Sequence, residues 1–505
     1  MRPLEILLVV ADLVAFLLLV VPLPGRARWL RHAALIPLPA MGAQLLVEGL
    51  RWQLVPAYAL AGLLLLVWLW RTSKPAGRPA RRRWTRRLAV GLGVGLGILG
   101  LAVAAALPMA FPVFRLPQPT GPYAIGTLTY HWVDAARPEV FTADPNDRRE
   151  LMVQLWYPAK GDPSAPRAPY IQDADVVAPA LARFMKLPEF ALGQLKYVTS
   201  NAVASVPVAD DQRSYPVLIF LEGLGGYRQM YTFQIQELVS HGYIVAAIDQ
   251  PYAAATVMFP DGRQAAYDPR MDPPHRQAGY DPRTAPAHSA FADAHIPYLA
   301  QDAVFTLDQL TALNRADPNG ILTGRLDLAR AGLFGHSLGG IVGGEVCRVE
   351  PRLRACLLED AYMRADVVRG GLRQPTMFIT RDADTMRLER RRSGGWSEAA
   401  IREHLITMRA VYERLPSDGY YVQVPGAFHV DMTDAPLLSP LATRLGLSGP
   451  IGGQRAHRII NAYSLAFFDR HLKGQPAALL DGPARQYPEV LLETRRPSRS
   501  PSPPA

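Results

Sequence analysis

The sequence predicts an α/β protein with a mostly parallel sheet, preceded by a bundle of about four transmembrane helices. Three observations support this prediction. Four apolar stretches occupy the first 107 of the 505 residues. Apolar strand-like segments then alternate with helical patterns, and a Gly-X-Ser-X-Gly motif at residues 335–339 lies between such a strand and such a helix. We expect residues 1–107 to form the transmembrane module, 108–122 a proline-rich spacer, 123–480 the α/β domain and 481–505 a disordered tail.

The transmembrane module is predicted from four apolar stretches: Leu4–Leu23, Ala33–Leu50, Leu54–Trp70 and Leu88–Leu107. A spanning helix needs about 20 apolar residues, so the first and fourth stretches are the strongest candidates. The second contains prolines and the third is short, so these two could instead form a tight helical hairpin. Asp12 lies within the first stretch, and we expect it to face other helices or to be protonated.

Positive charge is concentrated in this module and predicts its orientation. The chain has 54 Lys and Arg against 44 Asp and Glu, and residues 1–112 contain the whole excess. The remainder is neutral, which argues against nucleic-acid binding. Most of the arginines lie in the first and third connections, at residues 26–31 and 71–87. The positive-inside rule makes these connections cytoplasmic and places everything after Leu107 outside the cytoplasm, in our expectation at a bacterial plasma membrane.

The remainder of the chain alternates between strand and helix patterns, which is typical of a parallel sheet. The expected elements are strands Glu150–Tyr157, Val217–Leu221, Ile244–Ile248, Ala331–Phe334, Ala355–Leu358, Thr376–Thr380 and Tyr420–Val424, and helices near Tyr298–Leu313, from Leu338, near Ser397–Leu415 and near Gln454–Lys473. The Pro-, Asp- and Arg-rich run Asp261–Ser289 predicts a long surface loop that could form a lid.

The motif Gly335-His336-Ser337-Leu338-Gly339 supplies a candidate nucleophile. A nucleophile elbow turns sharply from a strand into a helix and holds its serine in a strained conformation. The flanking positions must therefore be nearly free of side chains, and both are glycines here. The apolar segment before the motif and the helical pattern after it match that context, so we expect Ser337 to be the nucleophile of an α/β-hydrolase fold.

A serine hydroxyl is a weak nucleophile, so a histidine base must follow it in the chain. His429 comes soon after the strand Tyr420–Val424, at the carboxyl edge of the sheet, and is the expected base. Five other histidines are not expected to be the base. His288, His295 and His336 precede Ser337 in the chain, whereas the base should follow it. His404 is expected at a solvated position of a helix, and His457 is expected to have a structural role.

Two positions compete for the acid that orients the histidine. Asp360 closes the strand after the elbow, whereas Asp382 and Asp384 close the next strand, the commoner place in this fold class. Because the ends of both strands face the same crevice, the residues alone leave the choice open.

Backbone N–H groups are expected to bind the oxyanion. Leu338, directly after the nucleophile, provides one, and Leu224 in the glycine-rich loop 222–226 is the candidate for the second. The two cysteines, Cys347 and Cys356, lack metal-ligand spacing, and we expect no metal and no cofactor. Two buried thiols are the favoured interpretation, and a single disulfide is the alternative.

Several of these segments resemble the plasma-type platelet-activating factor acetylhydrolase family. They are the glycine loop 223–228, the elbow 335–340, the Leu-Glu-Asp-Ala-Tyr-Met segment 358–363, and residues 121–134 and 148–158. The similarity extends from about Pro117 to Lys473. It implies Asp360 as the triad acid, His429 as the base and no metal. The family usually has His where this chain has Glu222, and an acid there could disfavour negative charge beside the oxyanion loop.

These features predict carboxylic-ester hydrolysis through an acyl-enzyme, and the resemblance implies short-acyl or oxidised phospholipids as substrates. Two alternatives stay open: an extracellular hydrolase of polyesters or small xenobiotic esters, and a membrane sensor that binds esters without turning them over. A basic group near Trp396 could contact a phosphate headgroup, although a solvated face is favoured: Arg387, Arg390, Arg391 and Arg392. The sequence leaves the oligomeric state open.

Overall fold

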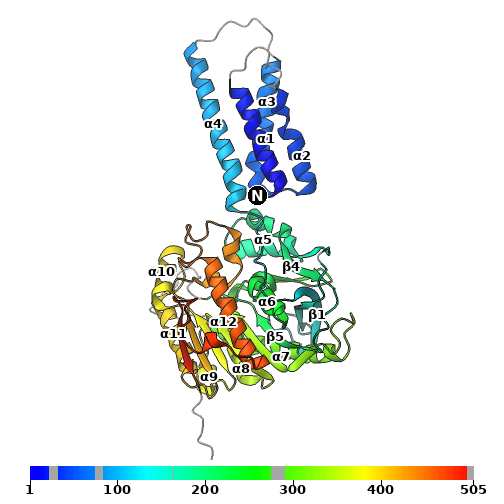
Figure 1. Cartoon of the computed structure of the whole chain (residues 1–505), viewed down its shortest axis with the longest axis vertical. Coiled ribbons are helices and arrows are strands. Elements are labelled where there is room, and N and C mark those ends of the chain that lie inside the picture. The colour runs from blue at the N-terminus through cyan, green and yellow to red at the C-terminus, as the bar shows by residue number, and fades with distance from the viewer. Residues whose placement is uncertain (22–31, 74–82, 163, 274–289, 497–505) are drawn as a thin grey trace, which may run out of the picture. The chain divides into compact units, whose positions relative to one another are not determined.

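The computed structural model describes residues 1–21, 32–73, 83–162, 164–273 and 290–496. The chain forms two compact units (Figure 1). The first comprises Met1–Phe114 with Leu438–Pro440, and the second comprises Arg115–Leu437 and the chain from Leu441 onward.

The first unit is built from apolar helices: α1 (Pro3–Val20), α2 (Pro37–Val47), α3 (Val55–Thr72) and α4 (Arg83–Ala110). Three segments of the described chain are long and apolar enough to cross a membrane, namely Pro3–Val20, Trp52–Thr72 and Leu88–Ala110. Helix α2 has 11 residues, about 16 Å at the rise of an α-helix, whereas the hydrocarbon core is about 30 Å thick. The expectation of about four transmembrane helices is therefore corrected: the described residues contain three helices long enough to span a membrane, and the second stretch forms a short helix.

Polar contacts show which helix ends lie together within this unit. The Arg51 guanidinium pairs with Glu5 at 2.5 Å and donates to the Phe111 carbonyl at 2.5 Å. At the other end, Arg71 Nη1 donates to the carbonyl of Leu19 at 2.6 Å. The beginning of α1 and the end of α4 thus share one end of the bundle, and the ends of α1 and α3 share the other. Asp12 is fully buried among the helices, as expected.

The second unit contains an eleven-stranded sheet with the order β13-β12-β11-β10-β9-β5-β6-β2-β1-β4-β3. Its strands are β1 (Ala124–Pro138), β2 (Arg148–Ala159), β3 (Arg167–Pro169), β4 (Thr199–Ala204), β5 (Tyr215–Leu221), β6 (Ile244–Asp249), β9 (Leu326–His336), β10 (Leu353–Glu359), β11 (Thr376–Thr380), β12 (Gly419–Gln423) and β13 (Leu491–Arg495). The six strands from β12 to β6 run parallel. This arrangement confirms the predicted parallel sheet.

Helices cover both faces of the sheet (Figure 1). The side chains of β5 alternate between two hydrophobic cores, with Val217 and Ile219 in one and Leu218 and Phe220 in the other. Helices α7 (Ala290–Arg315), α8 (Leu338–Val349) and α11 (Glu398–Tyr412) contribute to the first core. Helices α6 (Thr232–Ser240) and α12 (Gly453–Lys473) contribute to the second. The core strands are continuous apolar runs because both of their faces are buried.

The predicted boundaries of the spacer and the tail differ from the structure. Helix α4 continues through Pro108 to Ala110, and the Pro117 carbonyl already accepts a hydrogen bond from Asn201 of the second unit at 2.8 Å. At the C-terminus, β13 pairs antiparallel with β12 within the segment that was expected to be a disordered tail. The second unit therefore continues past residue 480 through β13, within the described residues.

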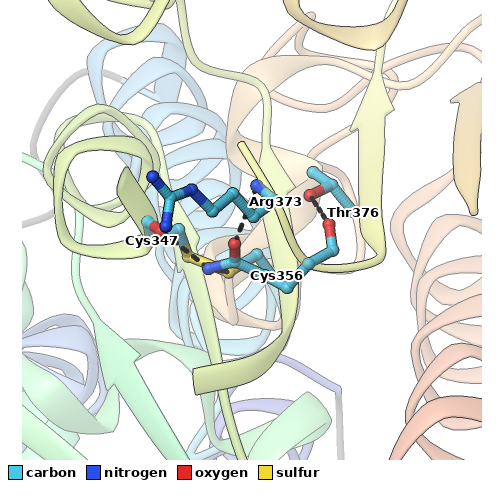
Figure 2. Close-up of a disulfide and its surroundings, with 5 residues drawn as sticks. Cys347, Cys356, Arg373 and Thr376 are labelled. Atoms are coloured by element: carbon cyan, nitrogen blue, oxygen red, sulfur yellow. Dashed lines mark hydrogen bonds between the residues drawn. A yellow bond between two sulfur atoms is a disulfide. The ribbon is translucent and has the colours of Figure 1, made fainter. Parts of the chain in front are cut away.

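The two cysteines form a disulfide between α8 and β10 (Figure 2). Both are buried, with their Cα atoms 6.6 Å apart. The Gln374 side-chain amide donates to the Cys347 carbonyl at 2.7 Å and lies 3.3 Å from the Cys356 sulfur. The favoured prediction of two thiols is wrong and the alternative holds, because the folded chain brings a helix and a strand together at this point. Disulfides of this kind persist in oxidising compartments.

Candidate active site

Ser337 lies at the turn between β9 and α8 with φ of 57° and ψ of −119°, a conformation that is unusual for a residue with a side chain. Neighbouring backbone leaves no room for side chains beside it. A Cβ on Gly335 would approach the Gly339 carbonyl oxygen to 2.4 Å, and one on Gly339 would approach the Leu221 carbonyl oxygen to 2.0 Å. The motif thus has its two glycines because the strand, the turn and the helix meet at backbone contact distance.

A continuous chain of hydrogen bonds links Ser337, His429 and Asp360. His429 Nε2 lies 3.0 Å from Ser337 Oγ, and His429 Nδ1 lies 2.5 Å from Asp360 Oδ2. The three side chains follow parallel strands of the same sheet: Ser337 follows β9, Asp360 follows the adjacent strand β10, and His429 begins the turn after β12, which β11 separates from β10. The three residues predicted as nucleophile, acid and base are therefore brought together at one edge of the sheet.

Asp360 is buried and surrounded by donors. Arg381 forms an ion pair with Oδ2 at 2.7 Å, and Oδ1 accepts from His404 at 3.0 Å and from Thr380 at 3.1 Å. Burial raises the pKa of the Asp360 carboxyl, but the Arg381 charge and the bonds from His404 and His429 outweigh it and hold that pKa well below its usual range. The carboxylate is therefore ionised at neutral pH.

The competing acids have other partners. The side chain of Asp384 is 92% exposed and pairs with Arg387 at 3.0 Å. Asp382 caps the N-terminus of α10 (Ala383–Ser393), where it accepts from the Thr385 backbone N–H at 2.9 Å. Neither bond leads to His429, so the geometry favours Asp360 as the partner of this histidine.

His404 does not lie in a solvated position, and that expectation is wrong. It is buried on α11 and donates through Nε2 to Asp360. A signal for this placement exists in the sequence, since Ile401, His404, Met408 and Val411 follow the three-to-four spacing of one buried helix face. His457, as expected, is a structural residue, buried and donating to the Thr433 carbonyl at 2.8 Å.

Leu224, in the glycine-rich loop after β5, lines the same cavity as the serine. The N–H groups on either side are occupied, because Gly223 donates to Tyr231 Oη at 3.1 Å and Gly225 donates to the Ala253 carbonyl at 2.7 Å. Leu224, Ser337 and Leu338 all line the same cavity. The residues expected to supply the two oxyanion donors therefore both belong to the wall of the cavity that contains the candidate nucleophile.

The surroundings of Glu222 favour the neutral form of its carboxyl group. Its carboxyl group is buried and accepts from the Gln250 backbone N–H at 2.7 Å. Burial raises the pKa of Glu222 well above the ordinary value, and the nearby Asp249 carboxylate raises it further. A raised pKa favours the neutral carboxyl group and so reduces the expected penalty on negative charge beside the oxyanion loop.

The cavity next to Ser337 has a volume of about 110 Å³ and is mainly apolar. Its lining includes Met271, Ile296, Ile341, Trp396 and, as polar members, Glu403 and His404. Part of the predicted lid contributes, since Met271 and Pro273 belong to the run Asp261–Ser289. Residues 274–289 of that run lie outside the described residues. An apolar group small enough for this cavity could sit beside the serine hydroxyl.

His336, Asp360 and His429 place possible metal-ligating atoms within 4.8 Å of one another. The group is poorly suited to a cation because Arg381 already pairs with the Asp360 carboxylate. The nearby basic residues are partnered as well: Arg387 pairs with Glu398 at 2.5 Å, and Arg390 pairs with the same carboxyl group at 3.4 Å. These pairs favour the interpretation of a solvated face over a phosphate site.

The chain is similar to known ester hydrolases. The family model for platelet-activating factor acetylhydrolase, isoform II, matches residues 109–277. The chain is 22% identical over 385 residues to the platelet-activating factor acetylhydrolase of Gallus gallus, covering 71% of this chain and 84% of the relative. It is 25% identical over 419 residues to a probable 1-alkyl-2-acetylglycerophosphocholine esterase of Arthroderma benhamiae, covering 77% and 96%.

A solved structure is also similar. Ferulic acid esterase from Streptomyces cinnamoneus superimposes with a TM-score of 0.57 at 29% identity, covering 75% of this chain and 99% of the esterase. The family model, the curated relatives and the esterase structure all point to the same chemistry. The chain is a carboxylic ester hydrolase related to the isoform II platelet-activating factor acetylhydrolases.

Proposed function

We propose that the protein hydrolyses esters through an acyl-enzyme on Ser337, with His429 as the base and Asp360 as the acid that orients it. The observation that supports this proposal most strongly is the unbroken hydrogen-bond chain from Ser337 Oγ through His429 to Asp360. A serine needs such a partner to become nucleophilic at neutral pH.

Each step of the proposed reaction has a residue to carry it out. His429 Nε2 takes the proton as Ser337 Oγ attacks the ester carbonyl, and the N–H groups of Leu224 and Leu338 bind the oxyanion. The alcohol leaves with the proton from His429, and Ser337 keeps the acyl group. Water then attacks the acyl-enzyme with His429 again as base, releasing the carboxylic acid. Ionised Asp360 keeps the proton on His429 Nδ1, so that Nε2 is free to accept.

We propose short-acyl or oxidised phospholipids as the substrate class. The names of the curated relatives favour this class, and the small apolar cavity suits a short acyl group next to Ser337. The similarity to a ferulic acid esterase favours small soluble esters as the second candidate. Apolar spans in the same chain favour lipid-derived esters, because they would hold the domain next to a membrane.

Substrate profiles of the detergent-solubilised full chain distinguish these candidates. We expect kcat/KM on glycerophosphocholine esters to fall by about tenfold or more between an acetyl and a palmitoyl group, because an acetyl group fits in the small cavity beside Ser337 and a palmitoyl chain would extend out of it. Ethyl ferulate should be a poor substrate in the same assay. Comparable rates on both acyl lengths, or a preference for ethyl ferulate, would contradict the proposed substrate class while leaving the acyl-enzyme mechanism intact.

We propose that the hydrolase unit lies outside the cytoplasm. The ends of α1 and α3 share one end of the bundle and immediately precede the arginine-rich connections, which the positive-inside rule keeps in the cytoplasm. Helix α4 ends at the opposite end of the bundle, as the contact between Arg51 and Phe111 indicates. The disulfide provides a second, independent argument for an oxidising compartment.

Cysteine labelling of intact cells tests this orientation. The two native cysteines are held in a disulfide, so a single introduced thiol reports its own exposure. We expect Gln264→Cys, at an exposed position of the hydrolase unit, to react with an impermeant maleimide. Thr72→Cys, at the exposed end of α3, should react only after the cells are permeabilised. The reverse pattern would place the hydrolase unit in the cytoplasm.

A further inference from the structure

The acid of the proposed triad binds two imidazoles rather than one. His429 bonds to Asp360 Oδ2 at 2.5 Å, and His404 bonds to Asp360 Oδ1 at 3.0 Å. The two histidines come from different elements, His404 from α11 and His429 from the turn after β12. Each carboxylate oxygen therefore has its own histidine, and the second one has no role in the mechanism described so far.

A single aromatic residue contacts both imidazoles. The Trp396 ring lies edge-on to His404 at 5.4 Å and to His429 at 5.3 Å between ring centroids. The Arg381 guanidinium, which pairs with Asp360, lies 4.8 Å over the same tryptophan ring. Trp396 and His404 also line the cavity beside Ser337. The second histidine is thus part of the wall of the site and not of a remote core.

The His404 bond constrains what Asp360 can do. A carboxylate can rotate about its Cβ–Cγ bond, and rotation would displace Oδ2 from His429 Nδ1. The bonds from His404 and Thr380 to Oδ1 hold the group against such rotation. They also draw negative charge toward Oδ1, because a donor stabilises charge on the oxygen that it contacts.

We propose that His404 is a positioning residue, which fixes the Asp360 carboxylate and limits the negative charge that it presents to His429. This inference rests on the proposed function and adds a residue to it. His404 must carry its proton on Nε2 to donate to Asp360. Burial lowers the pKa of His404 and favours the neutral ring, although the Asp360 charge acts in the opposite direction.

Other charged groups near this cluster also set the electrostatics of the site, and they remain in place when His404 is changed. They are Arg381 with its partner Glu389, Asp431, whose charge acts on Arg381, His336, whose ring is tilted against that of His429 at 4.3 Å between centroids, and Glu403 in the cavity wall. A change at His404 alone therefore isolates the contribution of its hydrogen bond.

Two substitutions at His404 distinguish the effect of its hydrogen bond to Asp360 from the effect of its side-chain packing. Leu in place of His404 fills the buried position without a donor, whereas the amide nitrogen of Gln can reach the place of Nε2. We expect His404→Leu to lower kcat/KM about tenfold by loss of a hydrogen bond to a charged acceptor. We also expect the acid side of the plot of kcat/KM against pH to shift toward higher pH by about half a unit, because more negative charge then faces the His429 imidazolium. His404→Gln should restore most of both values.

His457→Leu is the matched control, because His457 is equally buried and donates one hydrogen bond, but to the Thr433 carbonyl. This control should leave the pH profile unchanged, and thermal unfolding midpoints should be measured for all variants. An unchanged acid side of the pH profile in His404→Leu, or a shift of equal size in His457→Leu, would overturn the positioning role. Failure of the triad itself would be seen separately, as normal turnover in Ser337→Ala.

Discussion

Substitution of Ser337 by Ala should lower ester hydrolysis by about a millionfold, the scale seen when a triad nucleophile is removed. The side-chain hydroxyl of Ser337 bonds to His429, so its loss removes the nucleophile and leaves the surrounding packing unchanged. Any residual rate comes from the oxyanion donors and from substrate binding. Initial rates on p-nitrophenyl acetate measure the effect, and an unchanged thermal unfolding midpoint confirms that the fold is intact. Near-normal turnover in this variant would contradict the assignment of the whole site.

Substitution of Asp360 by Asn should lower kcat about ten-thousandfold, as expected when the orienting acid presents the wrong tautomer of the histidine. An Asn amide turned toward His429 would donate to Nδ1, place the proton on Nε2 and prevent that nitrogen from accepting the Ser337 proton. Arg381 and His404 would also lose their ionised partner, so the midpoint of thermal unfolding must be compared.

Asp384→Asn is the matched control, because the same change is made on an exposed side chain whose partner is the surface residue Arg387. Its effect on kcat should be less than about tenfold, a barrier change below about 1.4 kcal/mol. A severe loss in Asp384→Asn and a mild one in Asp360→Asn, at equal stability, would reverse the assignment of the acid.

The sheet and the elbow could be predicted from the sequence because both depend on local patterns. Strands such as Val217–Leu221 and Thr376–Thr380 are short continuous apolar runs, which is what burial on both faces requires. The glycines at 335 and 339 are required by backbone contact at a sharp turn. The family resemblance added the choice of Asp360, which the residues alone had left open between two strand ends.

The features that escaped prediction depend on contacts between distant segments. β13 is an edge strand that is largely exposed and pairs through its backbone, so its side chains carry little hydrophobic signal. The disulfide depends on the approach of α8 to β10, which no spacing of Cys347 and Cys356 could reveal. The burial of His404 depends on which face of α11 packs against the sheet, and that face includes Ile401 and Met408.

Covalent trapping of the nucleophile tests the central claim most directly. The purified full chain is incubated with a fluorophosphonate probe, and the modified residue is located by mass spectrometry of its peptides. We expect one phosphonyl group on Ser337, loss of esterase activity in step with labelling, and no labelling of Ser337→Ala. An enzyme that hydrolyses esters but is not labelled, or that is labelled at another residue, would contradict an acyl-enzyme on Ser337.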